Sequence, residues 1–415
     1  MSRFFWGSKG LSSLGSLGAQ GLNFVALLLP IFFGRLDQVA ILVVTSAIAG
    51  ISAFTFTFAF SSIYPGITDS ESRKQSFGAA VIGVMTSSIL LVLIGAAIAL
   101  FAAPWGIVVF WSGVVTLCQG LYLVATTVLV QQLRHGRFAA TRIAYATVNV
   151  LLTLLFSVVL LNPYGLVMAA AVCFAIGAAV ASWGKITALR DHLAADRLNL
   201  RDAASYVRAN WAATLSNLFA GLAFQSSALA TGFLGSFAGS WAGIIRVAGG
   251  FAGISQQVVS PPYDMRLSSA IRIGSALQIR RTILTTIIFG LAMAISAYVA
   301  VWGIFFFSIF VSSRTLEVGS ALPVLLTGGI YTFGVLIPSV CSKFLVMLGH
   351  QKPYFAWVLS KLGFTAVALT LLRGLDLLLA LACLELLSAT AFVLLLVFYR
   401  NRPHKLPQRI DVPVA

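Results

Sequence analysis

A long apolar segment between Gly235 and Asp264 contains an arginine, Arg246, near its middle. A charged side chain inside a membrane-spanning segment is costly, so it is treated as functional until shown otherwise. At about 100° per residue, the small and polar residues of this segment share a helical face with Arg246, and the bulky apolar residues occupy the opposite face. The shared face consists of Gly239, Gly243, Arg246, Gly250, Gly253, Gln257 and Asp264.

This face has two interpretations. In the first, the helix lines a cavity and presents the Arg246 cation to an anionic ligand. In the second, the glycines pack closely against a neighbouring helix and the arginine pairs inside the bundle. We favour cavity lining, because Arg246 is the one basic residue that the orientation signals described below do not explain.

Two further segments carry polar stripes that a lipid-facing helix would not tolerate. These stripes and the Arg246 face can enclose a hydrophilic cavity whose amides and hydroxyls suit sugar hydroxyls, or the amides can simply join helices. One stripe, in 11–33, contains Ser13, Ser16, Gln20 and Asn23, and the other, in 210–232, contains Asn210, Thr214, Asn217 and Gly221 with Gln225 at its edge. The predicted substrate-binding residues are Arg246, Gln20, Asn23, Asn217, Gln225 and Gln257.

Glu385 is the candidate for ion coupling. At about 1.5 Å per residue, it and Arg246 lie about 15 Å from the outer ends of their segments, so the two can meet. They would then form a structural ion pair, or a switch that a substrate anion or a proton opens; alternatively Glu385 titrates alone. Lys343 and Lys361 are placed near cytoplasmic helix ends, from which we expect them to reach lipid headgroups.

Patterns typical of enzymes are absent from the sequence. It contains no His/Glu metal box, no Walker loop and no Gly-x-Ser-x-Gly elbow, and its four histidines are scattered among polar segments. The segments between the apolar runs are too short for an extramembrane catalytic domain. We therefore predict no catalytic residue, no metal site and no cofactor, and a transporter rather than an enzyme.

The composition defines the broad class of the protein. The 415 residues are 59% hydrophobic and 9% charged, which excludes an ordinary soluble domain and indicates an all-α polytopic membrane protein. The net charge of +16 comes from basic residues dispersed between apolar segments, as orientation signals are, so nucleic acid is not an expected partner. The four cysteines lie inside apolar segments without paired spacing, which indicates neither disulfides nor zinc.

Apolar runs of about 20 residues predict twelve membrane spans in two groups of six. The predicted divisions are an N-terminal lobe 1–187, a cytoplasmic linker 188–209, a C-terminal lobe 210–400 and a cytoplasmic tail 401–415. The spans are 11–33, 38–60, 77–101, 104–130, 142–161, 164–187, 210–232, 236–263, 282–311, 317–347, 355–372 and 376–399.

The basic residues predict the orientation. With both termini in the cytoplasm, 23 of the 27 lysines and arginines fall on the cytoplasmic side or at its helix ends. Arg35, Arg314 and Arg373 would face outward, and Arg246 lies within a span. Such an asymmetry would be lost if a span were missing or added.

A weak internal repeat supports the division into six and six. Ala49-Gly50-Ile51-Ser52 in the second span recurs as Ala252-Gly253-Ile254-Ser255 in the eighth, 203 residues later, and each copy is followed by a proline-containing end. An offset of six spans makes the halves parallel repeats about an axis along the membrane normal.

The layout resembles the O-antigen-type polysaccharide flippases of the multidrug/oligosaccharidyl-lipid/polysaccharide exporter superfamily. The resemblance covers the whole chain in topology, while the matching residues are concentrated in the first, seventh and eighth spans. They are Phe233-Leu234-Gly235, Gly239-Ser240-Trp241-Ala242-Gly243, Ile245-Arg246-Val247 and Pro261-Pro262, together with Asn217 and Gly34.

The resemblance implies a V-shaped bundle of two six-helix lobes in the bacterial plasma membrane. Such a flippase moves an undecaprenyl-pyrophosphate-linked oligosaccharide from the cytoplasmic to the outer leaflet by alternating access. Arg246 would face the pyrophosphate or acidic sugars, and a basic cytoplasmic rim would attract the anionic lipid. The implied partners are this substrate, membrane lipids and glycan assembly proteins, with the protein itself a monomer. Few acidic residues lie within the spans, which departs from carboxylate-driven ion coupling.

Other functions remain open. A drug or metabolite exporter of the same superfamily would carry a small cationic solute, which fits poorly with Arg246 and one intramembrane acid. An unrelated twelve-span permease is a further alternative, although the loop 66–74 lacks the Gly/Asp/Arg pattern of the major facilitator type. A membrane scaffold without transport activity is the third.

Overall fold

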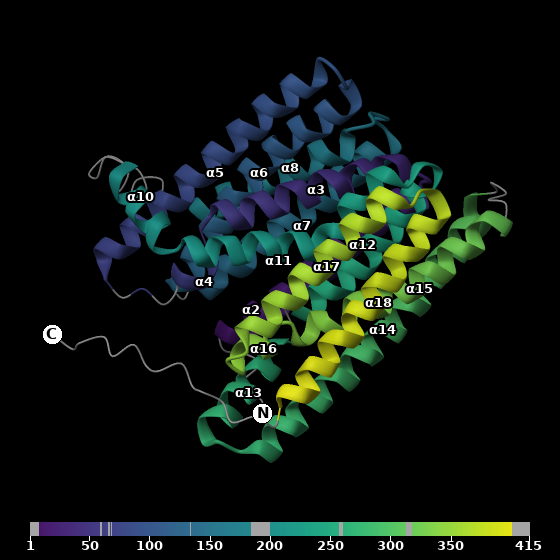
Figure 1. The fold of residues 1–415 in the computed structure, drawn as a ribbon. Coiled ribbons are helices and arrows are strands. Elements are labelled where there is room, and N and C mark those ends of the chain that lie inside the picture. The colour runs from purple at the N-terminus through teal and green to yellow at the C-terminus, as the bar shows by residue number, and fades with distance from the viewer. Residues whose placement is uncertain are drawn as a thin grey trace. The chain divides into compact units, whose positions relative to one another are not determined.

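The computed structural model describes residues 8–183, 200–256, 260–312 and 318–400, except 59, 65, 66, 68 and 133. These residues form helices joined by short turns, and no strand occurs among them (Figure 1). The predicted all-α polytopic class is therefore confirmed. Gln257, Arg314 and the predicted tail 401–415 lie outside the described residues.

The chain divides into two compact units, Met1–Gly232 and Phe233–Ala415, called here the N-terminal and the C-terminal unit. The helices of the N-terminal unit pack as α2 on α7, α5 on α6, α8 on α6 and α7, and α3 on α6 and α11. Their bounds are α2 Ser8–Phe32, α3 Leu36–Phe56, α4 Phe60–Ile63, α5 Ser70–Ala99, α6 Ala103–Gln131, α7 His135–Val158, α8 Gly165–Ser182, α10 Leu200–Ala209 and α11 Trp211–Ala230.

In the C-terminal unit, α15 is the central helix and packs against α12, α14 and α18, while α17 packs on α18. The short helix η2, Thr231–Phe233, lies at the division between the units. The bounds of the others are η3 Gly235–Phe237, α12 Ala238–Ile254, α13 Ser260–Ile273, α14 Ala276–Ser312, α15 Val318–Cys341, α16 Phe344–Met347, α17 Gln351–Leu371 and α18 Gly374–Tyr399.

Helix α11 follows the predicted linker but belongs to the N-terminal unit in this structure. It packs against α3, and Gly221 of α11 lies against Ile51 of α3 with an ordinary contact of 3.7 Å from its would-be Cβ. The contact-based division therefore falls after α11, and the lobe boundary at 188–209 stays a prediction.

Each of the twelve predicted spans overlaps a long described helix, and the spans 236–263 and 317–347 each extend into a second helix. Ten of the described helices are long and apolar enough to cross a membrane by length and composition. The two others are α2, whose apolar part is the shorter Gly18–Phe32, and α11. These are the helices with the predicted polar stripes, whose amides and hydroxyls lower the hydropathy.

The hairpin of α5 and α6 shows why two spans with so short a connection remain separate. Pro104 lies in the first turn of α6, where a missing N–H costs nothing. A methyl group at Gly106 would lie 2.2 Å from the backbone nitrogen of Ala99, and one at Gly95 would lie 2.3 Å from that of Phe110. The glycines therefore let the two backbones approach closely, as small residues do between membrane helices.

The predicted span 236–263 is wrong in its length. Helix α12 ends at Ile254, and a second helix, α13, begins at Ser260. The physical reason is Pro261-Pro262, because prolines are accommodated in the first turn of a helix but cannot continue one. Asp264 consequently belongs to α13 and does not share the Arg246 face of a continuous helix.

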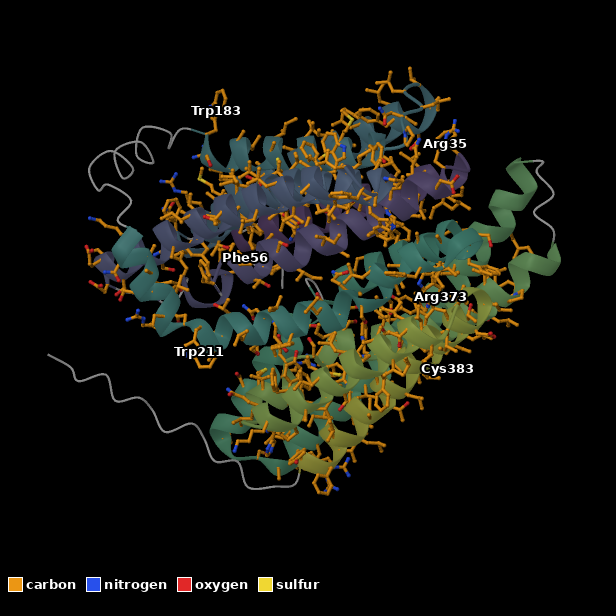
Figure 2. All side chains as sticks on the ribbon, turned by 45° about the horizontal axis from the view of Figure 1, so that its top comes forward. Arg35, Phe56, Trp183, Trp211, Arg373 and Cys383 are labelled. Atoms are coloured by element: carbon orange, nitrogen blue, oxygen red, sulfur yellow. The ribbon has the colours of Figure 1, made fainter. Side chains whose placement is uncertain are left out.

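Two of the arginines predicted to face outward bind helix ends. The Arg35 Nε donates to the Ser157 carbonyl at the end of α7 (3.0 Å). The Arg373 Nη1 donates to the Leu369 and Leu372 carbonyls at the end of α17 (2.5 and 2.7 Å). Figure 2 labels both arginines. The last carbonyls of a helix lack intrahelical partners and attract cations, which accounts for these exceptions to the charge asymmetry.

Candidate functional site

Helix α12 has one face that is fixed in the C-terminal unit. Trp241 and Ile244 are fully buried on it, in agreement with the predicted apolar face. The Trp241 ring lies 4.8 Å from the Tyr331 ring of α15. Ile244 fills the space beside Gly328 of α15, where a Cβ would lie 2.5 Å from the isoleucine side chain. This packing fixes the rotation of α12 and so determines where Arg246 lies.

The face of α12 that carries Arg246 is open from the arginine to the end of the helix. Arg246 is half-buried, with its Nη1 atom buried. A methyl group at Gly253 of the same face, or at Gly249 beside that face, would meet no atom within 4 Å. Gly239 and Gly243, in the two preceding turns, are buried. The face is therefore buried at Gly239 and Gly243 and has free space at Gly253, and its role in lining a cavity stays a prediction.

Asp264, which was expected on the Arg246 face, lies near Lys343. Its Oδ2 lies 3.9 Å from the Nζ of Lys343, whose side chain is 73% exposed. Burial raises the pKa of Asp264, and the positive charge of Lys343 opposes that shift. The exposure of Lys343 agrees with its predicted location at a helix end, while Asp264 ties α13 to the segment before α16.

Glu385 is part of a buried ion pair. Its Oε2 accepts a hydrogen bond from the Nζ of Lys361 at 2.7 Å, and the two side chains are only 4% and 6% exposed. Gly334 of α15 lies against the backbone of Glu385, where a Cβ would be 2.5 Å from its carbonyl carbon. The pair thus lies between α17 and α18 and is covered by α15.

The spacing of buried residues explains why these two side chains meet. Trp357, Lys361 and Thr365 follow one another at intervals of four residues on the buried face of α17. On α18, Glu385 shares the buried face with Phe392. The Trp357 Nε1 donates to the Ser388 carbonyl at 2.8 Å, and its ring lies 4.8 Å from that of Phe392, which fixes the register of the two helices.

The prediction that Lys361 reaches lipid headgroups is wrong. Helix α17 begins at Gln351 rather than near 355, so Lys361 lies ten residues inside it, about 15 Å along the helix axis. This depth and the four-residue spacing from Trp357 were the signals that could have assigned Lys361 to the interior. The hypothesis that Arg246 meets Glu385 stays a prediction.

In the N-terminal unit, the polar stripe of α2 takes part in contacts between helices. The Asn149 Nδ2 of α7 donates to the Asn23 Oδ1 at 3.1 Å, and the Asn149 Oδ1 accepts from the Thr153 hydroxyl at 3.4 Å. Gln20, one turn before Asn23, is half-buried. The amide of Asn23 therefore joins α2 to α7, as in the helix-joining interpretation, and its contact with substrate stays a prediction.

The stripe of α11 differs in its hydrogen bonds. Asn217 and Gln225 are half-buried, and their amides have no hydrogen-bond partner among the described residues. Asn210 and Thr214 instead donate to the carbonyls of Tyr206 and Asn210 at the junction of α10 and α11. Helix α11 thus offers two amides, those of Asn217 and Gln225, that the N-terminal unit leaves available.

Comparison with known proteins gives a result only at the level of structure. No protein-family model matches the chain, and no curated protein matches it by sequence. An inward-facing multidrug resistance MATE family transporter of the MOP superfamily superposes with a TM-score of 0.56 and 13% identity, over 94% of this chain and 92% of that one. The fold is that of MATE transporters.

Two further solved structures agree with this result. A MATE protein in complex with MaL6 gives a TM-score of 0.52 and 13% identity over 94% of this chain and 96% of that one. The eukaryotic MATE transporter AtDTX14 gives a TM-score of 0.52 and 13% identity over 96% of this chain and 91% of that one. The MATE-like fold therefore covers both units of the chain.

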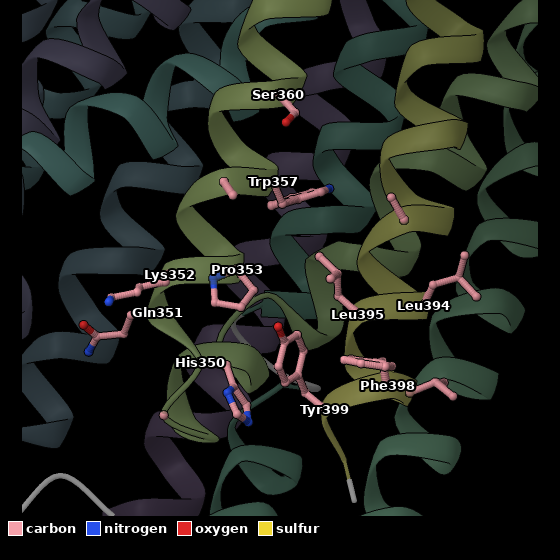
Figure 3. A pocket seen from close by; sticks show the side chains of 14 residues that line it. His350, Gln351, Lys352, Pro353, Trp357, Ser360, Leu394, Leu395, Phe398 and Tyr399 are labelled. Carbon is pink, nitrogen blue, oxygen red and sulfur yellow. The ribbon is translucent and has the colours of Figure 1, made fainter. Parts of the chain in front are cut away.

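The C-terminal unit of this MATE-like fold also has an open groove, of about 1410 Å³, between the start of α17 and the end of α18 (Figure 3). The His350 and Tyr399 rings meet at its end with a centroid distance of 4.2 Å. Apolar side chains including Leu394 and Phe398 line its length. None of the predicted site residues lines this groove, and no group that could hold a metal occurs in the described part of the chain.

Proposed function

We propose that this protein is a membrane exporter that works by alternating access and moves an undecaprenyl-pyrophosphate-linked oligosaccharide from the cytoplasmic to the outer leaflet. The MATE-like fold supports transport rather than enzyme activity, because the structural neighbours are transporters. MATE transporters of this fold are known in inward-facing and in outward-facing conformations. Alternation between two such states would carry a ligand across the membrane.

The observation that carries the substrate assignment is Arg246 on the open face of α12. A guanidinium presents a fixed set of donors that matches phosphate oxygens in a bidentate geometry, and its charge persists at all physiological pH values. A Cβ at Gly249 or Gly253 would meet no atom within 4 Å, so there is free space directly beside these glycines for part of a headgroup. Asn217 and Gln225 of α11 and Gln20 of α2 are the amides that we assign to sugar hydroxyls.

The distribution of acidic residues also supports an anionic substrate. Of the eleven acidic residues in the chain, Glu385 alone lies away from the ends of a described membrane helix. Its charge is paired with Lys361 in the protein interior. A cationic drug would therefore find few unpaired carboxylates along these helices.

The second candidate function is export of a small drug or metabolite. It is favoured by the fold, since a structural neighbour is a multidrug resistance transporter. The two functions differ in the charge and size of the substrate, and they predict opposite effects of removing the Arg246 cation.

Transport in proteoliposomes tests the role of Arg246. The Arg246→Ala variant is expected to reduce flipping of a fluorescent polyprenyl-pyrophosphate oligosaccharide by about tenfold or more, because a charge-assisted contact with phosphate is lost. Arg246→Lys retains the charge without the bidentate geometry and is expected to keep part of the activity. The matched control is Arg280→Gln, which removes an exposed arginine at the start of α14.

The same assay separates the alternatives. Unchanged flipping by Arg246→Ala contradicts the proposed contact. Export of a cationic dye that increases in Arg246→Ala, with no flipping by the wild-type protein, would identify the drug exporter. The remaining parts of the proposal are location in a bacterial plasma membrane, both termini in the cytoplasm, and glycan assembly proteins as partners.

Glu385 is proposed as the coupling residue, acting together with Lys361. Protonation of Glu385 or binding of a cation would break the pair and leave Lys361 buried without its counter-ion, which is unfavourable in a low-dielectric interior. Such a pair can therefore link an ion gradient to the packing of α17 and α18.

A further inference from the structure

A small polar pocket lies between α13 and α14 of the C-terminal unit, away from the Arg246 face and the buried ion pair. Its volume is about 410 Å³. The turn between the helices contains Gly274, whose φ of +71° is a conformation that glycine adopts without strain. This turn brings the two helices together, and the pocket is lined by Arg266, Ser269, Gln278, Arg281, Thr282 and Thr285.

The donors of this pocket are held by local contacts. The Arg266 guanidinium lies 5.6 Å from the centre of the Tyr263 ring, within the range of a cation–π contact. The Thr285 hydroxyl donates its proton to the Arg281 carbonyl at 2.8 Å and the Thr282 carbonyl at 3.0 Å, so it is not a donor to a ligand. The donors that remain are two guanidinium groups, one amide and the hydroxyls of Ser269 and Thr282, and they line one volume.

The pocket carries an uncompensated positive charge. No carboxylate lines it, and neither Arg266 nor Arg281 has an acidic partner within the described part of the chain. Asp264, the acidic residue of α13, lies 3.9 Å from Lys343 instead. Two arginines without a carboxylate, together with hydroxyl donors, are the chemistry of a phosphate site.

The pocket lies at the beginning of the membrane helix α14. The candidate span Ala276–Ile304 is longer than the roughly 20 residues that cross the hydrocarbon core, so its first turns, with Gln278 and Arg281, can lie among the lipid headgroups. Apolar side chains on the same hairpin are strongly exposed: Met265 by 66%, Ile273 by 69% and Leu277 by 77%. An amphipathic hairpin with basic and exposed apolar residues fits the boundary between headgroups and acyl chains.

We propose that the α13–α14 pocket binds the phosphate of an anionic phospholipid. The two arginines and the hydroxyls contact the phosphodiester, and the exposed apolar side chains lie beside its acyl chains. A soluble phosphate would use the same donors, but it would gain nothing from Met265, Ile273 and Leu277. A lipid is therefore the occupant that contacts both the polar donors of the pocket and the exposed apolar side chains beside it.

Native mass spectrometry of the full-length protein, released from detergent micelles in the presence of phosphatidylglycerol or phosphatidylcholine, tests this proposal. The wild-type protein is expected to retain phosphatidylglycerol preferentially. Arg281→Gln and Arg266→Gln are each expected to weaken that retention by about tenfold, because each removes a charge-assisted contact at the membrane surface. Retention of phosphatidylcholine is expected to change by less than about twofold, because its headgroup has no net charge.

Arg280→Gln is the matched control, because Arg280 is an exposed arginine next to Arg281 on the same helix but does not line the pocket. If positive charge on this surface attracted anionic lipid without a specific site, Arg280→Gln and Arg281→Gln would lose phosphatidylglycerol retention equally. Equal losses would overturn the proposal. Displacement of the lipid by millimolar inorganic phosphate would overturn the lipid as the occupant. Thermal unfolding of Arg281→Gln is measured alongside lipid retention. Arg281→Lys, which keeps the charge, is expected to recover part of the retention, and this separates loss of the contact from loss of stability.

Discussion

At the scale of single residues, Lys361 and Glu385 place opposite charges in the interior of the C-terminal unit, with an N–O distance of 2.7 Å. Bringing two ions out of water is costly, and their attraction offsets this cost only while both partners are present. Removing one partner leaves a buried, uncompensated charge. The pair therefore links α17 to α18, while it adds little to the net stability of the protein.

We expect Lys361→Met to lower the free energy of unfolding by about 3–5 kcal/mol, because the Glu385 carboxylate is left buried without a counter-ion. The double variant Lys361→Met/Glu385→Leu is expected to recover most of this loss. Thermal and denaturant unfolding in detergent give both values. Additive losses in the double variant would contradict a direct interaction.

Transport measurements on the same residue separate coupling from structure. Glu385→Gln keeps the size of the side chain and loses its charge, so it leaves Lys361 buried without its counter-ion and is expected to lower stability as well. In the protein that remains folded, any dependence of transport on a pH gradient is expected to disappear. A persistent pH-gradient dependence in this variant would contradict the coupling role of Glu385.

At the scale of an element, α12 has one face fixed by α15 and another that is open. Ile244 is fully buried beside Gly328, whereas Gly249 and Gly253 have free space around them. Glycines that look alike in the sequence therefore have two different structural roles. Gly328 allows two helices to approach, while the glycines after Arg246 leave room beside the cation.

Alanine substitutions are expected to distinguish these two purposes. Gly328→Ala places a methyl group 2.5 Å from the buried Ile244 side chain and is expected to destabilise the protein by about 1–3 kcal/mol through overpacking. Gly249→Ala meets no atom within 4 Å and is expected to stabilise α12 by up to about 1 kcal/mol through helix propensity. Thermal unfolding of the two variants under identical conditions measures both.

A larger side chain on the open face tests its function. Gly249→Leu is expected to leave unfolding close to that of Gly249→Ala and to reduce transport by obstructing the space beside Arg246. Loss of stability in Gly249→Leu together with unchanged transport by the folded fraction would show that this face is covered rather than lining a path.

At the scale of the whole molecule, the twelve predicted spans require α2 and α11 to cross the membrane, although neither is among the ten helices that are long and apolar enough by themselves. Their polar side chains are tolerable only if they face protein or water. The Asn23 amide of α2 already bonds to Asn149 of α7. Whether both helices cross the membrane determines on which side of it each loop between the helices lies.

Reporter fusions measure this topology. Fusions after residues 34, 190 and 415 are expected to report outside, cytoplasm and cytoplasm, because α2 crosses once and each half crosses six times. A cytoplasmic reporter after residue 34 with a cytoplasmic N-terminus would show that α2 does not cross. A C-terminal reporter on the outer side would contradict the crossing of α11 or of another C-terminal helix.

The sequence by itself determined the class of the protein and the approximate limits of most of its long helices. The predicted spans 38–60 and 376–399 correspond to Leu36–Phe56 and Gly374–Tyr399. These features are local, because the bilayer demands about 20 apolar residues and an internally hydrogen-bonded backbone from each span.

Only the tertiary structure decided which faces of these helices meet. It paired Lys361 with Glu385, bonded Asn23 to Asn149 and left Arg246 half-buried on α12. The sequence placed Lys361 wrongly because lipid tails are as apolar as a protein interior, so a membrane helix has no strong hydrophobic pattern that distinguishes the face toward protein from the face toward lipid. The partners of its few polar residues are therefore set by contacts between helices far apart in the chain.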